Sequence, residues 1–207
     1  MSALNKKSFL TYLKEGGIYV VLLVLLAIII FQDPTFLSLL NLSNILTQSS
    51  VRIIIALGVA GLIVTQGTDL SAGRQVGLAA VIAATMLQAV DNANKVFPDM
   101  ATMPIPLVIL LVCAIGAVIG LINGIVIAYL NVTPFITTLG TMIIVYGINS
   151  LYYDFVGASP ISGFDSHFSH FAQGFVALGS FRLSYITFYA LIAVFFVWIL
   201  WLSLIHI

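Results

Sequence analysis

Apolar stretches long enough to lie in a lipid bilayer recur along this chain and constrain its fold more than any other feature. Hydrophobic residues make up 61% of the sequence and charged residues only 7%. A helix crosses the bilayer core with about 20 predominantly apolar residues. The pattern therefore predicts an all-α fold, a polytopic transmembrane helical bundle with about six crossings. The apolar stretches are Ile18–Phe31, Val51–Thr65, Val76–Val90, Pro106–Leu130, Phe135–Tyr152 and Leu183–Trp201.

Several functional classes are excluded by the composition. The formal net charge is zero and the mean hydropathy is +1.19, which excludes a strongly acidic or basic soluble domain and a nucleic-acid-binding face. Cys113 is the only cysteine, so no disulfide framework or thiolate metal cluster is expected, and we expect Cys113 itself on a buried helix. The usual ATPase, metalloprotease and hydrolase motifs are missing from the sequence. We predict no catalytic residue, cofactor or metal ion in this chain.

A polar, glycine-punctuated segment, Thr65–Gly77, separates the second and third apolar stretches. Backbone leaves the helical state at membrane depth only where protein buries it or water reaches it. The segment is therefore either a short water-exposed loop followed by a helix cap, or a functional site at membrane depth. Asp69 and Ser71 are candidate N-caps for a helix that begins near Ala72, and Gly73 belongs to the same helix break.

Small residues recur four apart in the longest apolar stretch. Gly116, Gly120 and Gly124 fall on one face of a helix, which predicts close packing against a neighbouring helix. Asn123 lies next to that face, where an interhelical hydrogen bond is favoured over contact with a ligand.

Basic residues set the expected orientation in the membrane. Three lysines precede the first apolar stretch, which places the N-terminus in the cytoplasm. The first helix should end at Asp33, because proline disfavours helix in the residue before it. Counting crossings puts the turns near Arg74 and at Asn131–Pro134 inside. The connectors Asp91–Met103 and Asp154–Arg182 are then outside.

The connector Asp154–Arg182 is expected to be a long loop. It contains Asp165, His167 and His170, whose spacing is compatible with a metal site on a helix. No third histidine lies nearby, so solvated loop residues are the favoured interpretation.

The last residues break the charge pattern. A final helix that emerges in the cytoplasm should be followed by lysine or arginine, and residues 202–207 carry neither. We expect residues 1–201 to be the N-terminal part of a longer transmembrane domain and residues 202–207 to be a non-matching tail, from a truncation or frameshift. A genuine short C-terminus is the alternative.

Two motifs give the chain a family resemblance. Gly67–Gly73 (GTDLSAG) resembles the G-I-D-L-S-V-G signature of permease subunits in bacterial ABC importers for monosaccharides. Asn123–Met142 (NGIVIAYLNVTPFITTLGTM) is similar to the N-G-x-x-V-A-x-x-x-x-x-P-F-I-x-T-L-G-T-M block of the same family. Together with Asn41–Ile45, the resemblance covers nearly the whole chain to about Trp201.

The resemblance implies a transport subunit in the bacterial inner membrane with no ATPase site of its own. It would carry galactose, methyl-galactoside or a related monosaccharide. Its partners would be an ABC ATP-binding subunit, a periplasmic sugar-binding protein and a second permease subunit in a homodimer. The polar side chains expected at membrane depth are our candidates for the substrate pathway, with interhelical hydrogen bonding and capping as the alternative. These candidates are Gln66, Asp69, Thr137, Thr138 and Asn149.

Two other functional classes fit the residues less well. An ion-coupled secondary transporter or channel needs a charged relay inside the bundle, and Asp69 with Arg52 or Arg74 is the only material for one. A membrane-embedded enzyme lacks any nucleophile–base or metal constellation.

Overall fold

The computed structural model describes residues 3–65, 67–179 and 181–205. Nearly all of its regular structure is helical, which confirms the all-α prediction, and one short β-hairpin is added. The elements are α1 (Ala3–Gln32), η1 (Pro34–Leu37), α2 (Leu39–Val64), α3 (Ala72–Met86), α4 (Ile105–Leu130), α5 (Pro134–Phe155), α6 (Ser166–Gln173), β1 (Phe175–Leu178), β2 (Phe181–Ser184) and α7 (Tyr185–Ile205).

The first helix ends where proline predicts. α1 stops at Gln32, and Pro34 begins the short η1 helix. Asp33 stabilises this turn, because its Oδ1 accepts hydrogen bonds from the Thr35 backbone N–H at 3.0 Å and the Thr35 hydroxyl at 2.5 Å. The helix also reaches further back than the apolar stretch, to Ala3. Lysine, leucine and glutamate in that segment are good helix formers.

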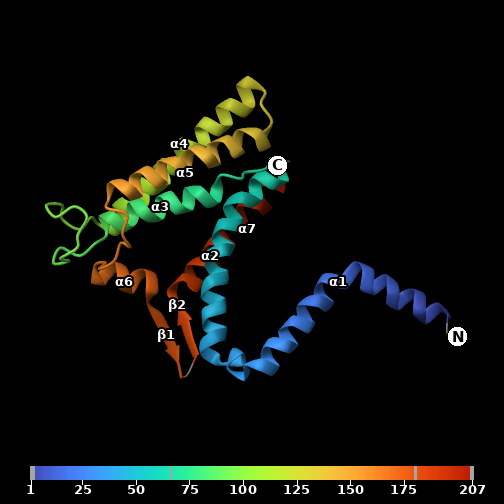
Figure 1. The fold of residues 1–207 in the computed structure, drawn as a ribbon. Coiled ribbons are helices and arrows are strands. Elements are labelled where there is room, and N and C mark those ends of the chain that lie inside the picture. Colours follow the sequence, from blue (N-terminus) through green and yellow to red (C-terminus); the bar gives the residue numbers. More distant parts are fainter. Residues whose placement is uncertain (1–2, 66, 180, 206–207) are drawn as a thin grey trace.

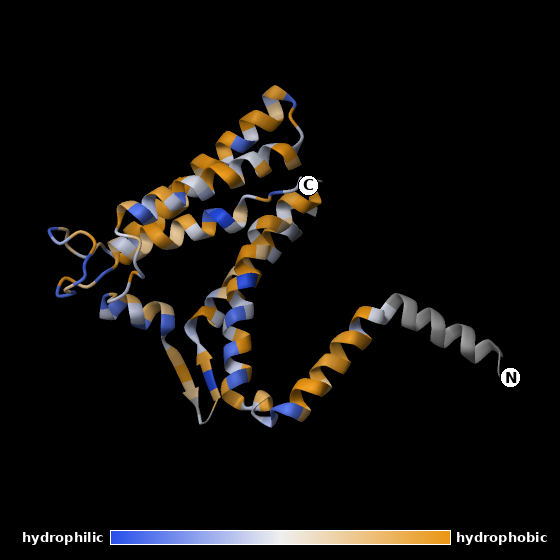
Figure 2. Cartoon of the chain, viewed as in Figure 1, coloured by the Kyte–Doolittle hydropathy of each residue, from blue (hydrophilic) through white to orange (hydrophobic). Residues whose placement is uncertain are grey.

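Apolar helices follow one another in the predicted order. Three of them, α2, α4 and α5, are long and apolar enough to cross a membrane. The apolar segments of the other three, Gly16–Gln32, Ala72–Met86 and Tyr185–Trp201, are shorter. In Figure 2, α4 and α7 are orange over most of their surface, whereas the first half of α2 carries blue polar bands.

The helices form two groups. α2 packs along α7, and α3 packs against both α4 and α5. Figure 1 shows the two groups as the arms of a V that come together near the end of α2, while α1 points away from both. A hydrogen bond ties each arm: the Ser50 hydroxyl donates to Thr187 Oγ1 at 3.2 Å, and the hydroxyls of Thr85 and Tyr152 lie 2.8 Å apart.

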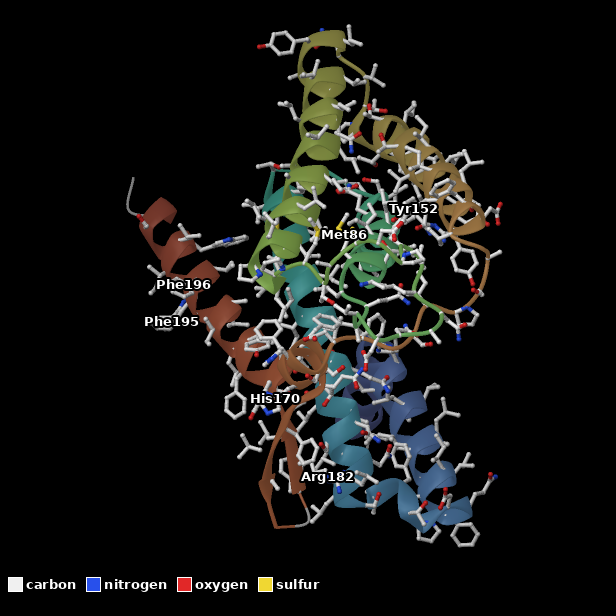
Figure 3. All side chains as sticks on the ribbon, turned by 90° about the vertical axis from the view of Figure 1, so that its left-hand side faces the viewer. Met86, Tyr152, His170, Arg182, Phe195 and Phe196 are labelled. Carbon is white, nitrogen blue, oxygen red and sulfur yellow. The ribbon has the colours of Figure 1, made fainter. Side chains whose placement is uncertain are left out.

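The prediction of a long loop over Asp154–Arg182 is wrong, because this segment contains α6 and most of the hairpin. Asp165 initiates α6 by accepting the His167 backbone N–H at 2.8 Å. β1 and β2 pair antiparallel with Phe175 opposite Ser184, and Gly179 takes a left-handed φ of 65° at the turn. In Figure 3, Arg182 lies on this hairpin beside α2, and its backbone oxygen accepts a hydrogen bond from the Ser43 hydroxyl.

One buried side chain joins the connectors at the far ends of α3 and α5. Gln88 is 1% exposed; its Nε2 donates to the Ser162 carbonyl at 2.9 Å, and its Oε1 accepts the Val96 N–H at 2.8 Å. Backbone hydrogen bonds flank it, from Ala89 N to Gly163 O and from Asp165 N to Leu87 O, both 2.9 Å. The two connectors that we predicted on the outside therefore lie together.

A candidate substrate cavity between two helix breaks

Two interruptions of the helical backbone meet at the end of the bundle opposite Gln88. The first is the segment 65–71 between α2 and α3, and the second is the turn 131–133 between α4 and α5. Asn131 ends α4 in the left-handed conformation, with φ 52°, and Pro134 begins α5. The Thr138 hydroxyl, near the start of α5, donates to the Thr68 carbonyl at 3.0 Å, so the first break contacts α5 next to the second break.

The first break closes against the end of α2. The Gly67 N–H donates to the Leu62 carbonyl at 2.8 Å, and a Cβ on Gly67 would stand 3.2 Å from that oxygen. A larger residue at position 67 would push the backbone away from α2.

Asp69 organises the start of α3. Its Oδ1 accepts the Ser71 backbone N–H at 2.8 Å and the Ser71 hydroxyl at 2.6 Å. Ser71 is fully buried at the N-cap position, and its Oγ accepts from Gln75 Nε2 at 2.8 Å rather than from a backbone N–H of α3. Asp69 thus acts on the helix start through Ser71, and its negative charge lies near the positive end of the α3 dipole.

Gly73 does not break the helix. It lies in the first turn of α3, and left-handed glycines in the described residues occur elsewhere. The interruption ends at Ser71 because the Asp69 turn presents the Ser71 carbonyl to the N–H groups of Arg74 and Gln75, at 2.9 and 3.0 Å.

A cavity of about 330 Å³ opens between these breaks and α4. The first break contributes Thr65, Thr68 and Asp69, α5 contributes Pro134 and Thr138, and the remaining wall is apolar or comes from α4. A largely apolar cavity with a few convergent polar groups is typical of small-molecule sites. This cavity offers a carboxylate, hydroxyls and an amide, which are groups that hold a ligand by hydrogen bonds.

The face of α4 towards the cavity carries glycines and one asparagine. Gly120, Asn123 and Gly124 line it. Asn123 is buried, and its Oδ1 accepts from the Thr141 hydroxyl at 2.5 Å, so the expected interhelical hydrogen bond is present. Asn123 also lines the cavity, together with its neighbours Gly120 and Gly124.

Only one of the three packing glycines approaches another helix in the described residues. A Cβ on Gly116 would lie 3.8 Å from Gln75 Oε1 of α3. At Gly120 and Gly124 no described atom comes within 4 Å of that position. These two glycines line the cavity, and their close packing against another helix stays a prediction.

The structure brings together some of the predicted pathway residues and separates others. Asp69 and Thr138 both line the cavity. Thr137 is buried, but its hydroxyl donates to the Thr133 carbonyl at 3.2 Å and it is not part of the wall. Asn149 lies eleven residues beyond Thr138, about 16 Å along α5. Gln66 lies outside the described residues.

Asn149 has an unusual environment. Its Oδ1 is buried and has no hydrogen-bond partner among the described residues. An unsatisfied buried acceptor costs about 1–3 kcal/mol. It does not line the cavity, so geometry assigns it no place in this site.

The charged groups near the cavity have separate partners. The Arg74 guanidinium lies over the ring of Tyr146 on α5, 4.6 Å from its centroid, whereas the Asp69 carboxylate is bound to Ser71. Arg52 is exposed on α2. Cys113, expected to be buried, is exposed on α4. In the residues that the structure describes, no group of three or more His, Cys, Asp or Glu lies together to hold a metal ion.

Comparisons with known proteins give one consistent family. Residues 41–204 match the model for the permease component of the branched-chain amino acid transport system. The chain is 94% identical over 201 residues to the galactose/methyl galactoside import permease protein MglC of Escherichia coli (strain K12). It is 73% identical over 201 residues to the MglC protein of Haemophilus influenzae.

More distant relatives carry a different sugar in their names. The ribose import permease protein RbsC of Haemophilus influenzae is 37% identical over 162 residues, which is 78% of this chain and 46% of that relative. The two MglC alignments cover 97% of this chain and 60% of each relative, so the chain spans about 60% of their length. No solved structure matches.

Proposed function

Because this chain belongs to the family of branched-chain amino acid transport system permease components, we propose that it forms part of the membrane subunit of an ATP-driven sugar importer. Its cargo is galactose, methyl galactoside or a related monosaccharide. The observation that carries the proposal is 94% identity to an MglC permease over 97% of the chain. At 37% identity the RbsC relative supports the same class of cargo.

The subunit performs no covalent chemistry in this proposal. ATP is hydrolysed on a partner ATP-binding subunit, a periplasmic protein delivers the sugar, and a second permease copy completes the path. The permease has conformations that open to either side of the membrane. Each partner shifts the equilibrium towards the conformation that the partner binds more tightly. The large apolar side chains exposed on α4 and α5 fit contact with lipid or with further protein, since soluble surfaces rarely expose so many.

The cavity at the two helix breaks is the proposed inner part of the sugar path. Asp69 and Thr138 are its polar wall, and Asn123 joins them. Gln66, Thr137 and Asn149 stay candidates for the path on their polarity alone. With the N-terminus in the cytoplasm of an inner-membrane protein, this cavity lies towards the cytoplasmic side.

A chimera tests the proposal. Residues 1–201 of this chain replace the matching part of E. coli MglC, and the product is expressed with its ATP-binding and periplasmic partners in cells without other galactoside transporters. We expect uptake of radiolabelled methyl β-galactoside, and loss of that uptake when the ATP-binding subunit is inactivated.

The rival ion-coupled mechanism predicts the opposite dependence. Uptake that continues with an inactive ATP-binding subunit and collapses when a protonophore dissipates the gradient would contradict the proposal. The separate partners of Asp69 and Arg74 argue against a charged relay between them.

A further inference from the structure

A second cavity lies at the other end of the molecule. It measures about 220 Å³ and is enclosed by the first half of α2, the end of α6 and the hairpin. Ser43, Asn44 and Thr47 come from α2, whereas Gln173, Phe175 and Arg182 come from α6 and the two strands. The sides of this pocket are about 130 residues apart in the sequence and meet only in the fold.

The hairpin is held in place against α2. The buried Ser43 hydroxyl donates to the Arg182 carbonyl. The Arg182 guanidinium lies over the Phe175 ring, 4.8 Å from its centroid, which links the two strands on the pocket side. The contact with Ser43 uses the backbone oxygen of Arg182, and its exposed side chain lines the pocket.

The chemistry of the wall suits a polyhydroxylated ligand. Asn44 and Gln173 are exposed amides, each with donors and an acceptor, and Arg182 adds a planar set of donors. Hydroxyl groups of a sugar both donate and accept, so paired amides and a guanidinium match them. Phe175, 46% exposed, supplies an apolar surface for the C–H face of a ring.

The position of the pocket agrees with the entry side of an importer. α6 follows the segment around Ser162 that Gln88 joins to the connector 91–103, and both connectors were predicted outside. The first cavity lies at the opposite end, between the breaks at 65–71 and 131–133. With the predicted orientation, the first cavity faces the cytoplasmic side and the pocket between α2, α6 and the hairpin faces the outside.

We propose that the pocket between α2, α6 and the hairpin is an outer binding site for a monosaccharide, with Asn44, Gln173 and Arg182 hydrogen-bonding to its hydroxyls. This proposal rests on the proposed function and adds to it a first place where the sugar is held on the permease itself. Ser43 positions the hairpin that closes the pocket.

Direct binding provides the test. The chimeric permease described above, purified with its ATP-binding subunits in lipid nanodiscs and without the periplasmic protein, is titrated with methyl β-galactoside by saturation-transfer difference NMR. Asn44→Ala and Gln173→Ala should each raise the apparent Kd about three- to tenfold, the loss of one or two hydrogen bonds. Thr47→Val, which keeps the side-chain shape, serves as a milder second variant of the wall.

Matched controls lie close by. Gln48→Ala on α2 and Asn94→Ala in the outer connector remove exposed amides that do not line the pocket, and they should leave the Kd unchanged. ATP hydrolysis by each purified complex reports whether it has assembled.

The outcomes separate the two proposals. Unchanged Kd values in assembled pocket variants, or no binding signal from a chimera that still imports the sugar in cells, would overturn the outer site and leave the proposed function standing. A chimera that imports no galactoside would overturn the proposed function and the outer site together.

Discussion

Asp69 and Asp165 perform the same local task in different surroundings. Each carboxylate accepts the backbone N–H of the residue two positions later, Ser71 or His167, at 2.8 Å. Asp165 does so at the start of α6, whereas Asp69 also lines the cavity between the helix breaks. Substituting each aspartate in turn therefore separates the effect of losing the local hydrogen bonds from the effect of losing a polar group in the cavity wall.

In the full-length chimera, Asp69→Ala should therefore lower methyl β-galactoside uptake more than Asp165→Ala. Asp69→Ala removes two local hydrogen bonds and Asp165→Ala removes one, and each variant should lose about 0.5–2 kcal/mol of stability. Only the first also removes a polar group from the proposed path. Uptake normalised to the amount of protein in the membrane is the measurement, and equal, normal uptake in both variants would remove Asp69 from the mechanism.

Asp33 offers a prediction about protonation. The hydrogen bond from the Thr35 hydroxyl, and then the one from the Thr35 backbone, lower the pKa of this exposed carboxyl below its ordinary value of 3.8. A lowered native pKa means that the carboxylate stabilises the turn above 3.8 and that this contribution is lost as the pH falls through the lower native value. Thr35→Val should raise the pKa towards 3.8, measured by NMR titration of the carboxyl carbon in micelles. Thr47→Val is the control, and an unchanged Asp33 pKa in Thr35→Val would contradict the hydrogen-bond explanation.

At the scale of elements, Gln88 joins the connectors that follow α3 and α5. Its amide makes hydrogen bonds to both connectors from a site that is 1% exposed. Gln88→Leu leaves the Val96 N–H without its partner, and an unsatisfied buried group costs about 1–3 kcal/mol, whereas the Ser162 carbonyl keeps its hydrogen bond from Asn92 Nδ2. Hydrogen–deuterium exchange should speed up in residues 88–103 and 156–165 together.

The exposed Gln48 provides the matched control for that experiment, because Gln48→Leu removes an amide with no such role. Faster exchange in only one of the two connectors would show that Gln88 does not join them.

Helices were predicted from the sequence more successfully than what lies between them. The end of α1 at Pro34 and the spans of α4 and α5 follow from apolar length and proline, which act locally. α6 and the hairpin were missed because their stability depends on distant partners, such as Ser43 on Arg182 and Leu87 on Asp165. The segment Phe175–Ser184 is also too short for its alternation to stand out.

The cavity was only half predicted for a related reason. Asp69 and Thr138 were chosen for their polarity, but their place in one cavity wall depends on two helix breaks about 65 residues apart in the sequence. Thr137 and Asn149 are equally polar and lie on the same helix, yet neither reaches the cavity wall. Composition identifies polar residues at membrane depth, whereas helix rotation and packing decide which of them share a space.

At the scale of the whole molecule, the family resemblance of Gly67–Gly73 and Asn123–Met142 is confirmed by the family match over residues 41–204. These motifs contain the two helix breaks beside the cavity, so residues that identify the family also contribute to the cavity wall. This coincidence is the structural reason for placing the sugar path there.

Sidedness is a prediction for the whole chain. In a chimera in which Cys113 is replaced by alanine, single cysteines at the exposed positions Ala93 and Ser159 should react from outside intact cells with a membrane-impermeant maleimide. A cysteine at the exposed Asn131 should react only after the membrane is opened. Labelling of Asn131→Cys in intact cells, or protection of both outer positions, would reverse the proposed orientation.

The joint made by Gln88 has a consequence for how such permeases diversify. The Gln88 side chain makes hydrogen bonds to residues 94–96 and to Ser162 at the same time. An insertion in either connector should therefore move one set of these partners out of hydrogen-bond distance. We therefore expect that these two connectors can be replaced by those of a relative only as a pair. Grafting both from a relative such as RbsC should preserve folding, whereas grafting one alone should separate the Gln88 amide from the Ser162 carbonyl or the Val96 N–H.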